Sequence, residues 1–186
     1  SADALAQVIS GGSYVLTADI DLSEVDWEPQ SQPYGSPKDI TLDGQGHTIS
    51  GLTGSADQYS SGLFGIVYGN LTARNLILRD FSFERGPVSG RSPRAGALAA
   101  WADKGLTLEN CVLDGFSLTA SDTGVSLESV GGFVGYAYGG SNCVLRDCAV
   151  RGTIDLSAGE DASLYCKFAG GMIGSLRCRG IQMTDC

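Results

Sequence analysis

The chain has 186 residues and a formal net charge of −9, with 12 Lys and Arg against 21 Asp and Glu. This acidic balance argues against binding to nucleic acid or to an anionic membrane surface, because both require basic residues. No apolar run approaches the roughly 20 residues of a membrane span. We therefore expect no membrane insertion, and from the charge balance no nucleic-acid partner. The 27 glycines are about twice the usual share and indicate many tight turns.

The first segment has the spacing of a short helix. Leu5, Val8 and Ile9 lie on one helical face, and two glycines follow at positions 11 and 12. We expect residues 1–13 to cap the open end of whatever apolar core follows.

Residues 14–60 read as the first coils of a solenoid. Tyr14–Leu16 and Ile20–Leu22 have strand character, and a Pro-rich loop spans 27–38. The stretch 40–52 (ITLDGQGHTISGL) reads as two strands around an Asp-Gly-Gln-Gly turn.

Residues 61–186 contain an internal repeat. Four segments align, at 61–80, 95–115, 131–152 and 170–186, and in each the second position is glycine. Those glycines are spaced 34, 36 and 39 residues apart, which suits coils with unequal loops. They are Gly62, Gly96, Gly132 and Gly171.

Each repeat holds two short strands of period two with no amphipathic helix between them. Short strands and bends that recur in this way predict an all-β fold, a right-handed three-sided parallel β-helix (solenoid) of about five coils. We expect 1–186 to form a single β-helix domain. The sequence stops just inside a strand at Cys186, so we also expect the chain to be an excerpt of a longer protein.

An Asn or Asp ends the bend between the two strands of every repeat. A tight bend needs one residue near the left-handed region, and Asn and Asp tolerate it better than other non-glycine residues. We therefore interpret this column as structural. Its members are Asn75, Asn110, Asp147 and Asp185.

The six cysteines fall into two groups. Cys111, Cys148 and Cys186 share one inward column, which favours a ladder of free structural thiols, and Cys143 takes the place of a leucine in another inward column. Cys166 and Cys178 lie outside these columns and are the pair that we expect to form a disulfide.

At this point a family resemblance emerges. Gly62-Leu63-Phe64-Gly65, echoed at 132–135 and 171–174, resembles the GLUG repeat of bacterial surface proteins. With the upstream LDGQGHTISGL and YVLTADIDL, the order of segments is similar to the β-helical non-catalytic region of IgA-specific metallopeptidases. The second repeat departs from the glycine motif, with Ala97-Leu98-Ala99 in place of the second glycine. The resemblance implies an extracellular, secreted or cell-surface bacterial protein that adheres to a partner or presents a neighbouring domain.

Two groups of side chains are candidates for binding. Three long inserts, 84–95, 119–130 and 157–169, leave the solenoid on one side, where loops on a rigid scaffold commonly bind ligands. Their charged residues are Arg85, Arg91, Arg94, Asp122, Glu128, Glu160 and Asp161. Aromatic residues at the corner after the glycine motif could stack on sugars or protein, or simply cover the corner; they are Tyr68, Trp101, Tyr136 and Tyr138.

Three functions remain open. The first is a non-catalytic adhesin-like or spacer module whose partner is a host glycan or glycoprotein, or another domain of the same parent chain. The second is a polysaccharide lyase or hydrolase, which would need clustered outward carboxylates; the candidates are Asp19, Asp21 and Asp43, or Asp80 and Asp114. The third is a purely structural stalk. His47 is the single histidine and no HExxH motif is present, so we expect no catalytic residue, no metal site and no cofactor.

Overall fold

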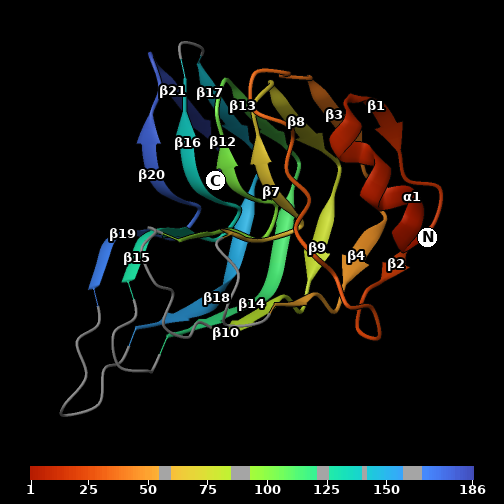
Figure 1. The fold of residues 1–186 in the computed structure, drawn as a ribbon, viewed down its shortest axis with the longest axis horizontal. Coiled ribbons are helices and arrows are strands. Elements are labelled where there is room, and N and C mark those ends of the chain that lie inside the picture. The colour runs from red at the N-terminus through yellow and green to blue at the C-terminus, as the bar shows by residue number, and fades with distance from the viewer. Residues whose placement is uncertain (55–59, 85–92, 121–125, 140–141, 157–164) are drawn as a thin grey trace.

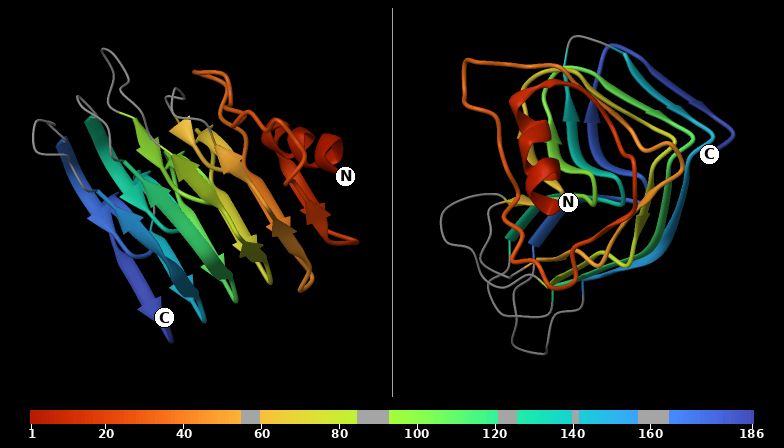
Figure 2. Two further views of the ribbon diagram at one scale, coloured as in Figure 1. Left: turned by 90° about the horizontal axis from the view of Figure 1, so that it is seen from below. Right: turned by 90° about the vertical axis from the view of Figure 1, so that its right-hand side faces the viewer.

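The computed structural model describes residues 1–54, 60–84, 93–120, 126–139, 142–156 and 165–186. The chain winds into a parallel β-solenoid whose strands stack from the N-terminal to the C-terminal end (Figures 1 and 2). Every strand pairing among the described residues is parallel, and residues that are about 35 apart in sequence become neighbours in the next coil, as in β13 and β17. This confirms the predicted all-β solenoid.

Four sheets form the sides of the solenoid. Sheet A has the order β1(Gly12–Val15), β3(Ile40–Asp43), β8(Leu71–Arg74), β13(Leu106–Glu109), β17(Cys143–Arg146), β21(Ile181–Thr184). Sheet B has the order β2(Ile20–Asp21), β4(Thr48–Ser50), β9(Ile77–Arg79), β14(Val112–Thr119), β10(Ser82–Glu84), β5(Thr53–Gly54), and β18(Ala149–Asp155) also pairs with β14. Sheet D has the order β19(Tyr165–Gly170), β15(Ser126–Gly131), β11(Arg94–Ala95), β6(Ser60–Ser61), and sheet C has the order β20(Ile173–Arg177), β16(Val134–Tyr138), β12(Ala99–Ala102), β7(Phe64–Val67).

The third side of the predicted three-sided solenoid is formed by two sheets. The third side is divided into sheets D and C by a short glycine-containing corner, such as Gly62–Leu63 between β6 and β7. Sheets C and D each contain four strands, so the number of coils bounded by strands on all sides is slightly smaller than the five expected. The inserts were expected to be loops, but their returning ends form β11, β15 and β19 of sheet D.

The glycine corner depends on close contact between coils. A Cβ on Gly62 would lie 2.2 Å from the carbonyl oxygen of Gly96, and one on Gly132 would lie 2.3 Å from that of Gly171. No side chain fits where the next coil's backbone already lies.

One detail of the repeat alignment is corrected by the strand register. Ala95 pairs with Val130 and Ala99 with Val134, which places Gly96 beside Gly131 rather than beside Gly132. Ala95 pairs with Ser61 and Ala99 with Phe64. Three residues, Gly96-Ala97-Leu98, therefore lie opposite only two, Gly62-Leu63. The added residue shifts the register at this corner, which alignment by glycines does not detect.

The N-terminal end is closed by the expected helix. It comprises α1(Ala2–Ala6) and the 3-10 turn η1(Gln7–Ser10), and Gly11 ends it with φ +88°. Leu5 and Val8 are buried against the first coil, so the helix covers one end of the apolar core (Figure 2).

The core is a set of apolar columns that run along the solenoid. In sheet A the inward positions of successive strands hold Ile40, Leu71, Leu106, Cys143 and Ile181. The first four are at most 1% exposed, whereas Ile181 in the last strand is 51% exposed. Each coil therefore depends on the next one for its burial.

Candidate functional site

An outward column of large side chains lies on sheet C. Trp101 pairs with Ile66 on one side and with Tyr136 on the other. The next position along the strands is inward, and there Val67, Ala102 and Ala137 are buried in the core. Because side chains alternate along a strand, Trp101 and Tyr136 project from the outer face of the sheet.

Five aromatic rings form a row there, which we call the aromatic ladder: Tyr34, Tyr68, Trp101, Tyr136 and Tyr138. Successive centroids are separated by 5.6, 6.2, 5.7 and 6.1 Å. Tyr34 is 90% exposed and Tyr138 is 45% exposed, whereas the three rings between them are half-buried. The structure thus brings all four predicted aromatics together and adds Tyr34.

Tyr34 joins the ladder because Gln32 docks the Pro-rich loop. The side-chain amide of this buried residue accepts hydrogen bonds from the backbone N–H groups of Tyr68 and Gly69, at 2.9 and 3.1 Å. It donates to the carbonyl oxygens of Ile9 and Lys38. The sequence analysis missed Tyr34 because it lies outside the repeat, in a segment that has no counterpart in later coils.

A charged pair lies against the centre of the ladder. The Arg94 guanidinium lies 4.5 Å from the Trp101 ring centroid and 5.0 Å from that of Tyr136, close enough for cation–π attraction. Arg94 also pairs with the Glu128 carboxylate, and the two side chains are only 11% and 24% exposed. These two are the members of the predicted charged set that the structure describes. The other five lie outside the described residues: Arg85, Arg91, Asp122, Glu160 and Asp161.

The inserts leave and rejoin the solenoid at stacked positions. Glu84, Thr119 and Asp155 are in register where the three segments begin. Arg94, Ser129 and Phe168 are in register where they return. The starting points therefore lie on one side of the solenoid.

Asp103 is a further polar group beside the ladder, and it was not predicted. It follows β12, at the level of Tyr68 and Tyr138 in the neighbouring coils. Burial raises the pKa of its carboxyl group, while the nearby Trp101 indole and Lys104 ammonium groups oppose that rise. A half-buried acceptor thus lies next to the half-buried rings.

The Asn/Asp column has the backbone geometry that a tight bend needs. Asn75, Asn110, Asp147 and Asp185 have φ between 50° and 53°. The Asn110 amide donates to Asn75 Oδ1 at 3.0 Å, and the Asn75 amide donates to Asp43 Oδ1 at 3.1 Å. Asp43 also accepts from Gln45 and Arg74, and these hydrogen bonds, led by the one from the Gln45 backbone, lower its pKa to about 2. The side chains link successive coils.

The cysteine pairing differs from the prediction. The disulfide joins Cys143 to Cys178, with Cα atoms 6.3 Å apart, and Cys166 is free. Cys178 lies at the corner between β20 and β21, and Ile181 of β21 is the register partner of Cys143, so this corner brings the two sulfurs of neighbouring coils together. Cys111, Cys148 and Cys186 remain thiols, and the neighbouring Cys148 thiol, together with burial, raises the pKa of Cys111.

The carboxylates considered for catalysis have separate partners. Asp19 contacts His47 at 3.1 Å, and Asp21 accepts a hydrogen bond from the backbone N–H of Ser23. Asp43 accepts one from the Asn75 side chain of the Asn/Asp column. Asp114 pairs with Arg151 of the next coil, and Asp80 is a bend residue with φ 55°. None of these contacts joins two of the carboxylates.

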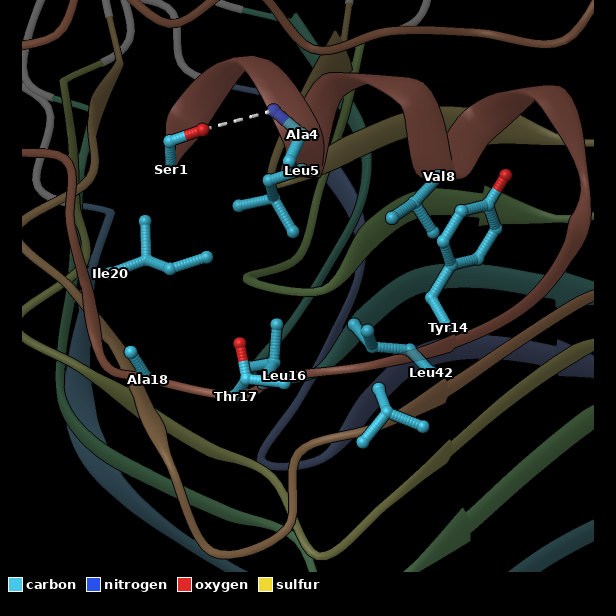
Figure 3. Close-up of a pocket in the computed structure, with 11 residues that line it drawn as sticks. Ser1, Ala4, Leu5, Val8, Tyr14, Leu16, Thr17, Ala18, Ile20 and Leu42 are labelled. Carbon is cyan, nitrogen blue, oxygen red and sulfur yellow. Dashed lines mark hydrogen bonds between the residues drawn. The ribbon is translucent and has the colours of Figure 1, made fainter.

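A pocket near the N-terminus is lined mainly by apolar residues. This pocket of about 140 Å³ lies between the cap and the first coil, lined mainly by core side chains such as Leu5, Val8 and Leu42 (Figure 3). No charged side chain lines it. Within the described part of the chain, no group of three or more His, Cys, Asp or Glu residues is arranged to hold a metal ion, and no helix is long and apolar enough to cross a membrane.

Comparison with known proteins identifies one coil. The model of the GLUG motif family matches residues 126–155, which run from the start of β15 to the end of β18. Comparison with curated proteins found no match. The fold is similar to the crystal structure of a candidate immunoglobulin A1 protease from Bacteroides ovatus, with 15% identity and a TM-score of 0.49 over 100% of this chain and 75% of that chain.

The class of protein follows from the strand pairing and the motif together. The chain is a parallel β-solenoid, and one of its coils matches the model of the GLUG motif.

Proposed function

We propose that the chain is a non-catalytic module of a larger bacterial protein, secreted or held at the cell surface, and that it binds a ligand on its outer face. The observation that carries this proposal is the contrast between the outward Arg–carboxylate pairs that join successive coils and the aromatic ladder. In each of these pairs the arginine neutralises the carboxylate, whereas the ladder leaves two rings exposed to solvent.

The Arg–carboxylate pairs join one coil to the next. Arg74 contacts Asp43 at 2.9 Å, Arg146 contacts Glu109 at 3.1 Å, and Arg151 pairs with Asp114. A glycoside hydrolase needs two carboxylates that face one sugar, with separate protonation roles. Carboxylates held against arginines of the next coil suit coil stacking better than acid–base chemistry.

The extracellular setting is supported by the cysteines and by the motif. A structural disulfide such as Cys143–Cys178 persists in oxidising compartments. The GLUG motif and the segments before it resemble those of bacterial surface proteins. A purely structural stalk, the remaining alternative, would gain nothing from exposed rings such as Tyr34 and Tyr138.

The test combines binding and cleavage assays on the whole 186-residue chain. The chain would be applied to a glycan array and to surfaces coated with mucin or immunoglobulin, and incubated in parallel with polysaccharides. We expect retention on at least one surface without the release of new reducing ends or unsaturated sugars. Cleavage would establish the enzyme alternative, and absence of retention at high concentration would leave the stalk.

A further inference from the structure

We propose that the aromatic ladder is a binding site for an uncharged pyranose oligosaccharide that lies along the solenoid axis, across the coils. This inference rests on the proposed function, that the module binds a ligand, and it names the site and the ligand class.

The direction of the ligand follows from where the rings originate. Tyr34 precedes β3, Tyr68 follows β7, Trp101 lies in β12 and Tyr138 lies in β16. These four rings belong to four successive coils, and Tyr136 shares β16 with Tyr138. From Tyr34 to Tyr136 the row therefore runs across the strands, which are spaced about 4.8 Å apart where they pair, and its last step follows β16. A ligand that contacts both ends must be elongated, so a chain of sugar rings fits and a single sugar does not.

The order of groups along the row matches the two surfaces of a pyranose. Its C–H face is apolar and stacks on aromatic rings, while its hydroxyl groups project from the edge and form hydrogen bonds. Tyr34 and Tyr138 offer exposed rings at the two ends. Between them Arg94 lies over the Trp101 and Tyr136 rings, so the centre offers donors rather than a bare stacking face.

The polar groups at the centre are few and already held in place. Arg94 presents guanidinium donors, and Glu128 and Asp103 present carboxylate acceptors. Both charged partners of the Arg94–Glu128 pair are largely buried, so little side-chain freedom is lost when a sugar binds. A small number of fixed polar groups among aromatic rings is typical of specific small-ligand sites.

The charge balance selects an uncharged sugar. Glu128 neutralises Arg94, Asp103 adds a carboxyl group beside the ladder, and the whole chain carries −9. A uronic or sialic acid would have to displace Glu128 from Arg94 and approach against the net charge. Hydroxyl groups carry no such penalty.

The experiment is a calorimetric titration of the full 186-residue chain with neutral oligosaccharides of increasing length. The probes are gluco-, manno- and galacto-oligosaccharides, with an oligogalacturonate of matched length as the acidic counterpart. We expect affinity for at least one neutral series to rise with length until the ligand spans the ladder, and the acidic probe to bind more weakly. Tyr34→Ala and Tyr138→Ala should each weaken binding about tenfold, which is the loss of one stacking contact.

The control is Val15→Ala, which removes an exposed apolar side chain on sheet A that is 56% exposed. It should leave the affinity unchanged, and thermal unfolding would verify that all variants fold. The inference is overturned if affinity does not depend on length, if the acidic probe binds better, or if the double variant Tyr34→Ala/Tyr138→Ala binds as the parent does. A ligand from the array that binds this double variant normally would leave the proposed function standing and remove only the assignment of the ladder.

Discussion

The side chain of Gln32 is bonded to the backbone of Tyr68, whose N–H lies 2.9 Å from Gln32 Oε1. This contact attaches the Pro-rich loop to the second coil, and with it Tyr34 to the aromatic ladder. Because Gln32 is only 4% exposed, the groups that it satisfies would be left buried without it.

We therefore expect Gln32→Ala to lower the free energy of unfolding by about 2 to 4 kcal/mol, since several buried backbone groups lose their partner. Urea titration of the parent and the variant measures this loss. Gln30→Ala is the matched control, because Gln30 is exposed and its side chain bonds only to the Glu28 carbonyl. Equal effects of the two substitutions would contradict the role of Gln32.

Asp43 predicts a pH dependence of stability. Its pKa in the folded chain is about 2, below the usual 3.8, so it contributes stability that is complete above pH 4 and is lost as the pH falls toward 2. Asp43→Asn should remove roughly 1 to 2 kcal/mol at neutral pH and should be less sensitive to acid over that window. Urea unfolding at a series of pH values measures the difference, with the exposed Glu24→Gln as control. Parallel pH curves for Asp43→Asn and the parent would show that the network around Asp43 carries no stability.

The disulfide predicts both a thiol count and a stability change. The denatured, unreduced chain should expose four thiols, from Cys111, Cys148, Cys166 and Cys186. The bond closes a loop with a sequence separation of 35, so the double variant Cys143→Ala/Cys178→Ala should lose roughly 3 to 4 kcal/mol. Thiol titration and peptide mapping test the pairing, and a peptide that links Cys166 to Cys178 would contradict it.

The corner glycines offer a matched pair of substitutions. A Cβ on Gly132 would lie 2.3 Å from the Gly171 carbonyl oxygen, whereas a Cβ on Gly171 meets nothing within 4 Å. Gly132→Ala should therefore destabilise the chain by about 2 kcal/mol or more through overpacking, and Gly171→Ala should change stability little. Thermal unfolding of both variants tests this, and similar melting shifts would show that coil contact is not the reason for the glycine.

The features that the sequence predicted well are the ones that recur. Alternation such as Leu106 and Leu108 indicated strands, because one face of each strand must be buried in the stack. The recurrence of Asn75 and Asn110 indicated the bend, because few other residues adopt its backbone angles. The N-terminal cap was evident from Leu5 and Val8 for the same reason, the need to cover apolar surface.

Only the tertiary structure decided the contacts and the register between coils. The extra residue in Gly96-Ala97-Leu98 shifts the register, and no local pattern reveals which residue the next coil will place beside it. Cys178 meets Cys143, and Tyr34 meets Tyr68, because distant segments are packed at the same level of the stack. The alternation of side chains is a property of one strand and can be recognised in a few consecutive residues. The side-chain partners between coils depend instead on the length and path of the chain segments that connect them.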